Sequence, residues 1–489
     1  MLYFQSHNRI SIRMQNGLDD FASARCCRLK ISVKEKKRMK KYLVLLLALC
    51  MVFSLCAFGT MAEAAGTEKQ QIIVAFNDAS DTGENGFTYK WIKSVADKWN
   101  NDEYEIVIQD EPVSDSDFTT KMHLQLSNAS TAPDIVLYDG FQLQSDISAG
   151  YFIPLDELAK AWDGWNNGYI SEYTKGIGTG IDGVLYGIPA FTDTRCIWTN
   201  KDIFDQAGLG KDWQPTTWAE LLDGLTVVKD KTGVIPIYLP SSEGEGEKTT
   251  MQGFLMYYYG TGERLVDDAT GIWNINTQGL YDSFALYHDI YANGLGMPEA
   301  EILDSHARNT ATDYFKASEM AAYQYGTWYA SKFLPQNSPW EGFEDIIAPI
   351  KVPAQNGGGF ISLSGGSCLA ISTACECPEA AFDFIAALFE DVDSYVDYLI
   401  GGGNLSVVPS ASENEKYVSE FPFLDEAIEY LEFSYFRPAN ENYATVSTFI
   451  STAVEMAVTG PAEDALAYYN QAVTDLVGAD FVNDGGYLK

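Results

Sequence analysis

Histidine is scarce in this sequence, with four residues in a chain of 489. His123, His288 and His306 are isolated from one another, and none stands beside a serine or cysteine in a recognisable nucleophile motif. A serine or cysteine hydrolase needs a histidine base that a third residue orients, so the sequence argues against that class of enzyme. Carboxylates are abundant, but no spacing singles out two of them as the acid pair of a glycoside hydrolase.

Basic residues are also few: 32 Lys and Arg stand against 68 Asp and Glu, for a formal net charge of −36. A surface with this excess of negative charge repels phosphate groups, which argues against nucleic acid as a partner. The three glutamates of SSEGEGEK, which are Glu243, Glu245 and Glu247, are expected to lie in a solvated loop.

Cysteine is limited to eight residues. Three of them crowd into SCLAISTACEC, which is not the spacing of a secreted disulfide framework. Cys-x-Cys without a nearby histidine or a second cysteine pair is a weak zinc signal. We therefore expect Cys196, Cys368, Cys375 and Cys377 to be mostly buried as small apolar residues, with a disulfide from Cys368 or Cys377 as the alternative.

The sequence has one long apolar run, LVLLLALCMVFSLCAFG, at residues 43–59. It follows Met39 and two lysines and precedes a small-x-small triplet that ends at Ala64, which is the pattern of a cleaved signal peptide. We expect residues 39–64 to be that signal. Residues 1–38, which begin with MLYFQS, are expected to be a tag or other non-native leader.

A membrane anchor is the alternative for this run, although the run is short of a comfortable span. Lipidation at Cys56 is a further alternative, but a bacterial lipobox has a small residue before its cysteine, and Leu55 stands there. The prediction is an exported protein, extracellular or at the cell surface, and periplasmic if the source is Gram-negative.

After the signal, short apolar strands alternate with amphipathic helices. QIIVAFND is typical of a buried strand, FTYKWIKSVADKWNN of a helix, and YEIVIQDE of the next strand, which together predict a parallel sheet in an α/β fold. Asn77 and Asp78 follow the first strand, and Asp139 ends a later one in PDIVLYDG. Because open α/β sheets bind ligands at the carboxyl ends of their strands, these three residues are candidate ligand contacts.

No metal or cofactor is expected. Residues 78–89 begin with the spacing of a calcium loop, but the twelfth position is Tyr89, where a calcium loop needs a glutamate. GIGTGIDG lacks the Lys-Ser/Thr of a phosphate loop, so it is expected to be a turn.

Seven segments, in order along the chain, resemble those of the extracellular solute-binding proteins of ABC sugar importers, of the maltose-binding type. They are PDIVLYDG, GYFIPLDEL, LYGIPAFTDTRCIWTNKDIFDQAGL, WQPTTWAELL, ASEMAAYQYGTWYAS, GGSCLAISTACECPEAAFDFIAALF and VVPSAS. The resemblance covers nearly all of the chain after the predicted signal.

This resemblance implies a two-lobed periplasmic-binding-protein fold of class II, with three crossover segments as its hinge. It places residues 65–190 and 352–408 in the N-terminal lobe, and residues 191–351 and 409–489 in the C-terminal lobe. The crossings are expected at GIPAFTDTRCIWTNK, around residues 347–359, and around residues 404–409.

The resemblance also implies which residues meet the ligand. Trp328 matches the tryptophan that stacks on sugar, since a pyranose offers an apolar face to an aromatic ring and a rim of hydroxyls to polar groups. Asp193 and Arg195 lie at the first crossing and are expected to face the cleft, with a pair that only holds the hinge together as the alternative.

Two glycines and several aromatic residues complete the candidate site. Gly365 and Gly366 would let the backbone approach a ligand closely, with turn geometry as the alternative. Secondary aromatic platforms are Tyr257, Tyr258, Trp273 and Tyr325, with core packing as the alternative for each.

The implied function is capture of a sugar, an oligosaccharide rather than a monosaccharide, by hinge closure and its delivery to the permease subunits of an ABC importer. The protein is expected to be a monomer and not an enzyme. There are two alternatives: a binding protein for a peptide, polyamine or metal, and a secreted glycoside hydrolase.

Overall fold

The structure is a computed structural model, and it describes residues 69–77, 86–111, 113, 115–168, 170, 174–267, 269–304 and 306–488. The expected leader (1–38), the expected signal peptide (39–64) and Asp78 lie outside the described residues. Residues 69–489 form one compact unit of the chain.

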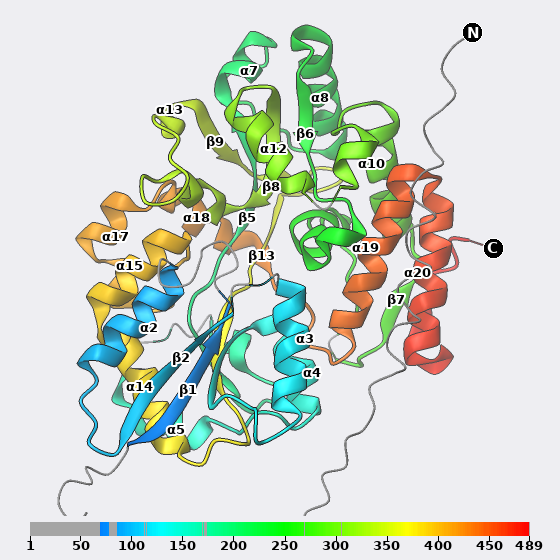
Figure 1. Ribbon diagram of the computed structural model, residues 1–489. Helices are drawn as coiled ribbons and strands as arrows, with labels where there is room; N and C mark the ends of the chain where they lie inside the picture. Colours follow the sequence, from blue (N-terminus) through cyan, green and yellow to red (C-terminus); the bar gives the residue numbers. More distant parts are fainter. Residues whose placement is uncertain are drawn as a thin grey trace, which may run out of the picture. The chain divides into compact units, whose positions relative to one another are not determined.

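A five-stranded sheet organises the first lobe, which is the lower half of Figure 1. Its strand order is β2-β1-β3-β12-β4, with β1 parallel to β2 and β3, and with β12 antiparallel to β3 and β4. The strands are β1 (Gln70–Phe76), β2 (Tyr104–Asp110), β3 (Ile135–Asp139), β4 (Gly187–Pro189) and β12 (Ser367–Ile371). The predicted strand-helix-strand start of a parallel sheet is confirmed.

Helices cover both faces of this sheet. Alternate residues of β3 point to opposite sides, so that Ile135 and Leu137 join one apolar cluster and Val136 and Tyr138 join another. The first cluster packs under α2 (Phe87–Lys98), α14 (Pro378–Glu390) and α15 (Val392–Gly402), and the second packs under α3 (Asp115–Leu126) and α4 (Gly140–Ser148). The shorter helices of this lobe are α5 (Asp156–Ala161), α6 (Asp163–Asn166), η2 (Lys175–Gly178), α16 (Pro409–Ser412), α17 (Glu415–Glu420) and α18 (Leu424–Glu429).

A four-stranded sheet of order β6-β8-β5-β9 organises the second lobe. Its strands are β5 (Arg195–Asn200), β6 (Ile235–Tyr238), β8 (Met320–Gly326) and β9 (Ile347–Ile350), and every residue of β8 is buried. The helices around it are α7 (Lys201–Gln206), α8 (Trp218–Thr232), η3 (Glu243–Glu245), η4 (Thr249–Phe254), α9 (Leu255–Gly260), α10 (Gln278–Ala292), α11 (Glu299–Ile302), α12 (Ala307–Lys316), η5 (Thr327–Phe333) and α13 (Phe343–Ile346).

The C-terminal part of the chain packs on the second lobe. It contains η6 (Tyr430–Phe433), α19 (Tyr443–Thr459), α20 (Ala462–Val477), η7 (Ala479–Phe481) and β14 (Val482–Asp484), and β14 pairs with β7 (Trp273–Ile275). Gly460 and Pro461 separate α19 from α20. The break follows from the missing N–H of proline.

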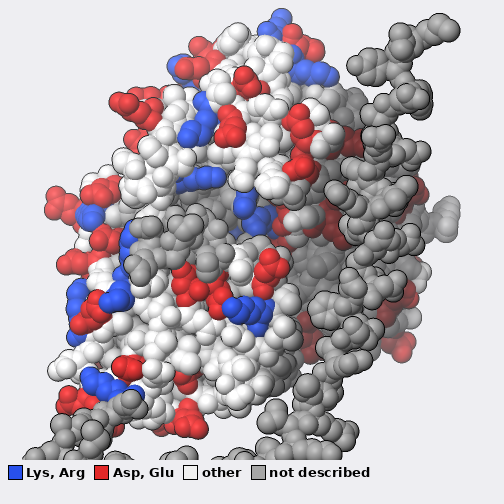
Figure 2. Space-filling model, in the orientation of Figure 1, with Lys and Arg blue, Asp and Glu red and all other residues white. Residues whose placement is uncertain are grey.

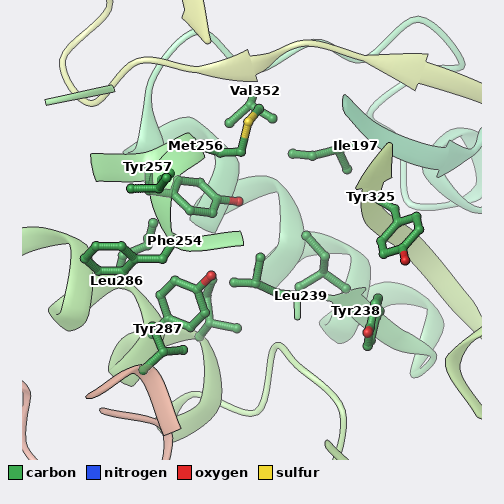
Figure 3. Close-up of a cluster of buried hydrophobic side chains, with 14 of the residues drawn as sticks. Ile197, Tyr238, Leu239, Phe254, Met256, Tyr257, Leu286, Tyr287, Tyr325 and Val352 are labelled. Atoms are coloured by element: carbon green, nitrogen blue, oxygen red, sulfur yellow. The ribbon is translucent and has the colours of Figure 1, made fainter. Parts of the chain in front are cut away.

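The core of the second lobe is rich in buried aromatic rings. Figure 3 shows Phe254, Tyr257 and Tyr287 packed with aliphatic side chains such as Leu286 and Val352. Tyr257, Tyr258 and Trp273, which the sequence suggested as secondary ligand platforms, are at most 1% exposed. These three rings are therefore core residues, which was the stated alternative.

The four described cysteines are free. Cys196, Cys368 and Cys377 are buried and Cys375 is half-buried, as expected for small apolar residues. Burial raises the pKa of the Cys196 thiol.

Three passages connect the two lobes. The first runs from β4 to β5 over residues 190–194. The second leaves β9 through β10 (Val352–Pro353) and β11 (Phe360–Leu363) and reaches β12 over residues 364–366. At this junction β10, β11 and β13 (Ser434–Tyr435) form a three-stranded sheet of their own.

The third passage lies further along the chain than the expected residues 404–409. Leu405 bridges to Thr192 beside the first passage, and the first-lobe core continues to Ala427. The second-lobe core resumes at Tyr430. The third passage lies this late because residues 411–427 supply apolar side chains to the first lobe. The sequence had suggested that the second lobe begins at residue 409.

A buried hydroxyl ties the first passage to the chain around residue 407. The Tyr395 hydroxyl donates to the Ala190 carbonyl at 2.9 Å and accepts from the Val407 N–H at 3.3 Å. We expect Tyr395→Phe to lower the free energy of unfolding by about 1–2 kcal/mol, because two buried backbone groups lose their partner.

Chemical denaturation measures this effect. Tyr468→Phe on α20 is a matched control, for which we expect a change below about 0.5 kcal/mol. A loss no larger for Tyr395→Phe than for this control would show that the hydroxyl does not hold the passage.

Candidate functional site

A group of polar and aromatic residues meets where the two lobes join, and we call it the inter-lobe site. Its members are Asp139, Phe141, Asp193, Arg195, Glu247, Tyr325, Trp328, Gly365, Gly366, Arg437 and Tyr443. They come from the end of β3 and the start of α4, the first and second passages, the start of β5, the segment before η4, the end of β8, η5, the segment after β13 and the start of α19. Two surface depressions of about 220 and 380 Å³ lie along α2 and share no lining residue with this site.

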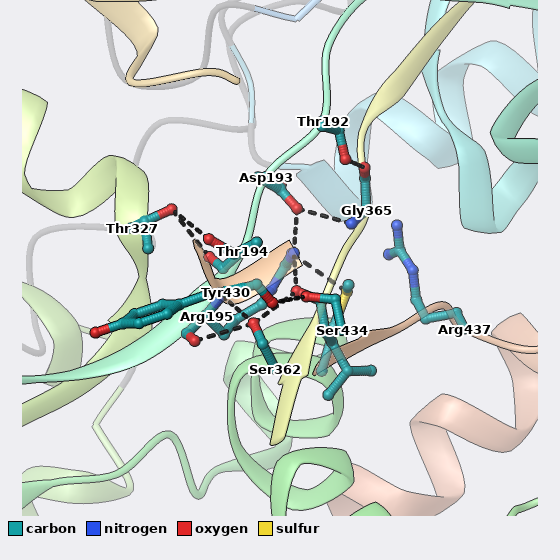
Figure 4. Close-up of polar contacts among 12 residues, drawn as sticks. Thr192, Asp193, Thr194, Arg195, Thr327, Ser362, Gly365, Tyr430, Ser434 and Arg437 are labelled. Carbon is teal, nitrogen blue, oxygen red and sulfur yellow. Dashed lines mark hydrogen bonds and ion pairs between the residues drawn. The ribbon is translucent and has the colours of Figure 1, made fainter. Parts of the chain in front are cut away.

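A buried ion pair holds the first passage against the second (Figure 4). Arg195 Nη1 pairs with the Asp193 carboxylate and also donates to the Leu363 carbonyl at 3.1 Å. Asp193 Oδ1 accepts from the Gly365 N–H at 2.7 Å. Burial lowers the pKa of the Arg195 guanidinium, and the charge of Asp193 opposes that shift. These contacts match the alternative in which the pair holds the hinge together.

The two glycines lie where these passages approach most closely. A Cβ at Gly365 would lie 3.0 Å from Arg437 Nη2 and 3.3 Å from Asp193 Oδ1. Gly366 has φ +141° and its Cβ would lie 2.1 Å from the Phe191 carbonyl oxygen, so a side chain is excluded there on both counts. Close approach of backbone to backbone therefore explains Gly366, whereas Gly365 is packed against side chains.

Arg437 connects the two lobes, and the sequence reasoning missed it. Its Nη2 donates to Asp139 of the first lobe at 2.6 Å, and its Nη1 pairs with Glu247 of the second lobe at 3.3 Å. The guanidinium carbon also lies 4.7 Å from the centre of the Phe141 ring. A signal was present, because Arg437 is the sole basic residue between Lys416 and Lys489.

Glu247 is not part of a solvated loop. Its side chain is 19% exposed and accepts from the hydroxyls of Tyr443, at 2.9 Å, and Ser447. Burial raises the pKa of Glu247, and the charge of Arg437 opposes that shift. Glu245 is also engaged, by the Tyr238 hydroxyl at 2.7 Å, so the expectation for SSEGEGEK fails where the loop meets the core.

Asp139 lies at the carboxyl end of its strand, as expected. One of its oxygens accepts from the Phe141 N–H at 3.2 Å, which caps α4, and the same oxygen accepts from Arg437. The Asp139 side chain is 44% exposed, against 7% for Arg437. Asn77 directly follows the parallel neighbour β1 at the same edge of the sheet and is half-buried.

Trp328 lies at the contact between the lobes and is half-buried. The Arg195 guanidinium carbon is 4.8 Å from its ring centre, and Tyr325 meets it edge-on at 5.4 Å. Its backbone packs on Gly403 of the first lobe, where a Cβ would come within 2.7 Å of the Trp328 Cα. Tyr325 is 5% exposed, and its hydroxyl accepts from Arg308 Nη1 at 2.8 Å.

The described residues contain no group of three His, Cys, Asp or Glu side chains that could hold a metal ion. Within the same ranges, no helix combines the length and apolar character needed to cross a membrane.

Two lobes of α/β type, joined by three passages with polar and aromatic groups at the junction, define a two-lobed binding protein. The profile of the family described as "Bacterial extracellular solute-binding protein" matches residues 85–393. The chain belongs to this family, and the expected fold class is confirmed.

Curated relatives match part of the chain. An arabinooligosaccharide-binding protein of Halalkalibacterium halodurans is 26% identical over 215 residues, which cover 42% of this chain and 43% of the relative. A binding protein of Brucella abortus is 28% identical over 196 residues, which cover 37% of this chain and 45% of the relative. The chain thus matches less than half the length of these relatives.

Solved structures resemble the whole fold. The GacH receptor of Streptomyces glaucescens, solved unliganded and with acarbose, has a TM-score of 0.69 at 19% identity and covers 84% of this chain and 100% of its own. Maltose-bound MalE3 of T. maritima has a TM-score of 0.70 at 19% identity, with coverage of 83% and 100%. At these identities the likeness establishes the fold.

The charges around Arg437 give a prediction about the contact between the lobes. Arg437→Met leaves Glu247 as an unpaired, mostly buried carboxylate, so we expect the free energy of unfolding to fall by about 3 kcal/mol. Adding Glu247→Gln removes that charge and should restore most of the loss. Chemical denaturation compares the two variants; a double variant as unstable as the single one would assign the loss to packing on Phe141.

Proposed function

We propose that this chain captures a carbohydrate between its two lobes and delivers it to the permease subunits of an ABC importer. The observation that carries the proposal is the pairing, at one junction, of a half-buried tryptophan with a 44%-exposed carboxylate on the opposite lobe. An indole ring suits the C–H face of a pyranose, and a carboxylate accepts hydrogen bonds from its hydroxyls. Relatives named for arabinooligosaccharides, acarbose and maltose support the same ligand class.

Each lobe contributes its own set of ligand contacts. Trp328 and Tyr325 belong to the second lobe, whereas Asp139 and Asn77 belong to the first, so a ligand gains both sets of contacts only when the lobes meet. Such differential contacts shift an open-to-closed equilibrium toward the closed form. The hinge lies beside this ligand and is formed by Asp193, Arg195, Gly365 and Gly366. It positions the backbone groups that would contact the ligand.

The proposed protein is exported, acts as a monomer and breaks no bond. Its family is one of solute-binding proteins, which supports a binding role. Export through the signal at residues 39–64 would bring the protein to the face of the membrane where an importer takes up its substrate.

Calorimetric titration against a panel of oligosaccharides tests the proposal. Binding of a sugar raises the melting temperature by mass action, so a thermal-shift screen selects the sugars to titrate. If a peptide or polyamine stabilises the protein and none of the sugars does, the carbohydrate assignment is wrong. Release of shorter sugars during incubation would instead identify a hydrolase.

Trp328→Ala tests the stacking role. We expect the affinity for the selected sugar to fall at least about tenfold, because the apolar face of the sugar loses its platform. Trp213→Ala is a matched control, since Trp213 is a half-buried tryptophan that stacks on Phe204 in α7 at 4.6 Å. Equal affinities for these two variants would contradict the role of Trp328.

A further inference from the structure

Three cations of the second lobe interact electrostatically with one another, and we call them the basic cluster: Arg308, Lys316 and Lys332. Arg308 and Lys316 lie on α12, and Lys332 lies on η5, the short helix that also carries Trp328. Arg308 reaches the Tyr325 hydroxyl at 2.8 Å, and the Tyr325 ring meets the Trp328 ring at 5.4 Å. The cluster is therefore continuous with the aromatic part of the inter-lobe site.

The described residues place no carboxylate within ion-pair distance of these three cations. The ion pairs found there engage other residues, such as Arg195 with Asp193 and Arg437 with Asp139 and Glu247. Lys316 instead lies 5.8 Å from the centre of the Phe333 ring. Carboxylates act on the cluster from beyond that distance, Glu245 on Arg308 and Asp313 on Lys332. In a chain with 68 acidic and 32 basic residues, three neighbouring cations with no carboxylate in direct contact are an unusual local excess of positive charge.

The cluster is partly removed from water and repels itself. Arg308, Lys316 and Lys332 are all half-buried. Burial lowers the pKa of the Lys332 ammonium, the positive charges of Arg308 and Lys316 lower it further, and the charge of Asp313 opposes the shift. A half-buried cation with no carboxylate in direct contact raises the free energy of the empty site, and an anion that binds there removes part of that cost.

The segment that carries Lys332 lies beside the first lobe. Asn337, which follows η5, donates to the Gly401 carbonyl of the first lobe at 3.2 Å, so this part of the second lobe borders the first. Figure 2 shows basic side chains along the upper edge of the hollow between the lobes and acidic side chains along its lower edge. The two walls of the site therefore differ in charge.

We propose that the ligand is an acidic oligosaccharide, whose carboxylate binds the basic cluster while its ring stacks on Trp328. This inference rests on the proposed function and specifies its substrate class. The cations of the two ion pairs are already occupied, whereas Arg308 and Lys332 have donors for a carboxylate. At the other wall, Asp139 accepts hydroxyl hydrogens from a sugar unit further along the chain.

Calorimetry with matched sugars tests this inference. Trigalacturonate and trimannuronate are each compared with their methyl esters, which keep the rings and linkages but remove the charge, and maltotriose represents a neutral sugar. We expect an acid to bind at least about tenfold more tightly than its ester at low salt, and the preference to shrink as salt screens the cluster.

Lys332→Gln should remove most of the preference for the acid while leaving affinity for the ester within about twofold. Lys332→Arg keeps the charge and should keep the preference, which guards against a folding defect in the first variant. Lys231→Gln, which removes an exposed cation from α8, is the control for net charge and should change neither affinity.

The outcomes separate the inference from the proposed function. An ester or maltotriose that binds as tightly as the acids overturns the acidic specificity but leaves carbohydrate capture standing. If wild type and Lys332→Gln prefer the acid over its ester equally, the basic cluster does not bind the carboxylate. If a sulfated sugar binds more tightly than a carboxylated one, the charged group of the ligand is not a carboxylate. If no sugar binds, both proposals are wrong.

Discussion

The buried ion pair between Asp193 and Arg195 is the contact on which the junction of the lobes depends. A guanidinium at 4% exposure is costly unless its charge is compensated, and the Asp193 carboxylate supplies the compensation while it also accepts from the Gly365 N–H. One carboxylate therefore fixes the first passage, the second passage and the cation beside Trp328. The passages are held close enough that Gly366 has no room for a side chain and Gly365 is tightly enclosed by neighbouring side chains.

Around this fixed point the two lobes present unlike surfaces. The first lobe offers Asp139 at the end of β3, and the second offers Trp328, Tyr325 and the basic cluster. Arg437 spans the gap by pairing with a carboxylate from each lobe. A ligand held between such walls gains hydrogen bonds from one lobe and stacking and charge from the other, which couples binding to the approach of the lobes.

Local patterns explain why much of the fold was predictable. The alternation of buried strand and amphipathic helix defined β1, α2 and β2, and Thr217 caps α8 by accepting from the Glu220 N–H, as a capping motif predicts. The third passage was misplaced because residues 411–427 form short helices that follow the same pattern in either lobe. Their membership in the first lobe is decided by packing of Tyr417, Phe421 and Leu424.

The sequence by itself determined the α/β class, the strand ends that carry Asn77 and Asp139, and the passage through Asp193 and Arg195, because each of these leaves a pattern within a few neighbouring residues. Only the tertiary structure brought Arg437 to Asp139, 298 residues away, buried Glu247, and placed Arg308 on the Tyr325 hydroxyl with Lys332 nearby. Contacts between residues so distant along the chain depend on how the lobes pack, and isolated charges in the sequence do not reveal which partners that packing will give them.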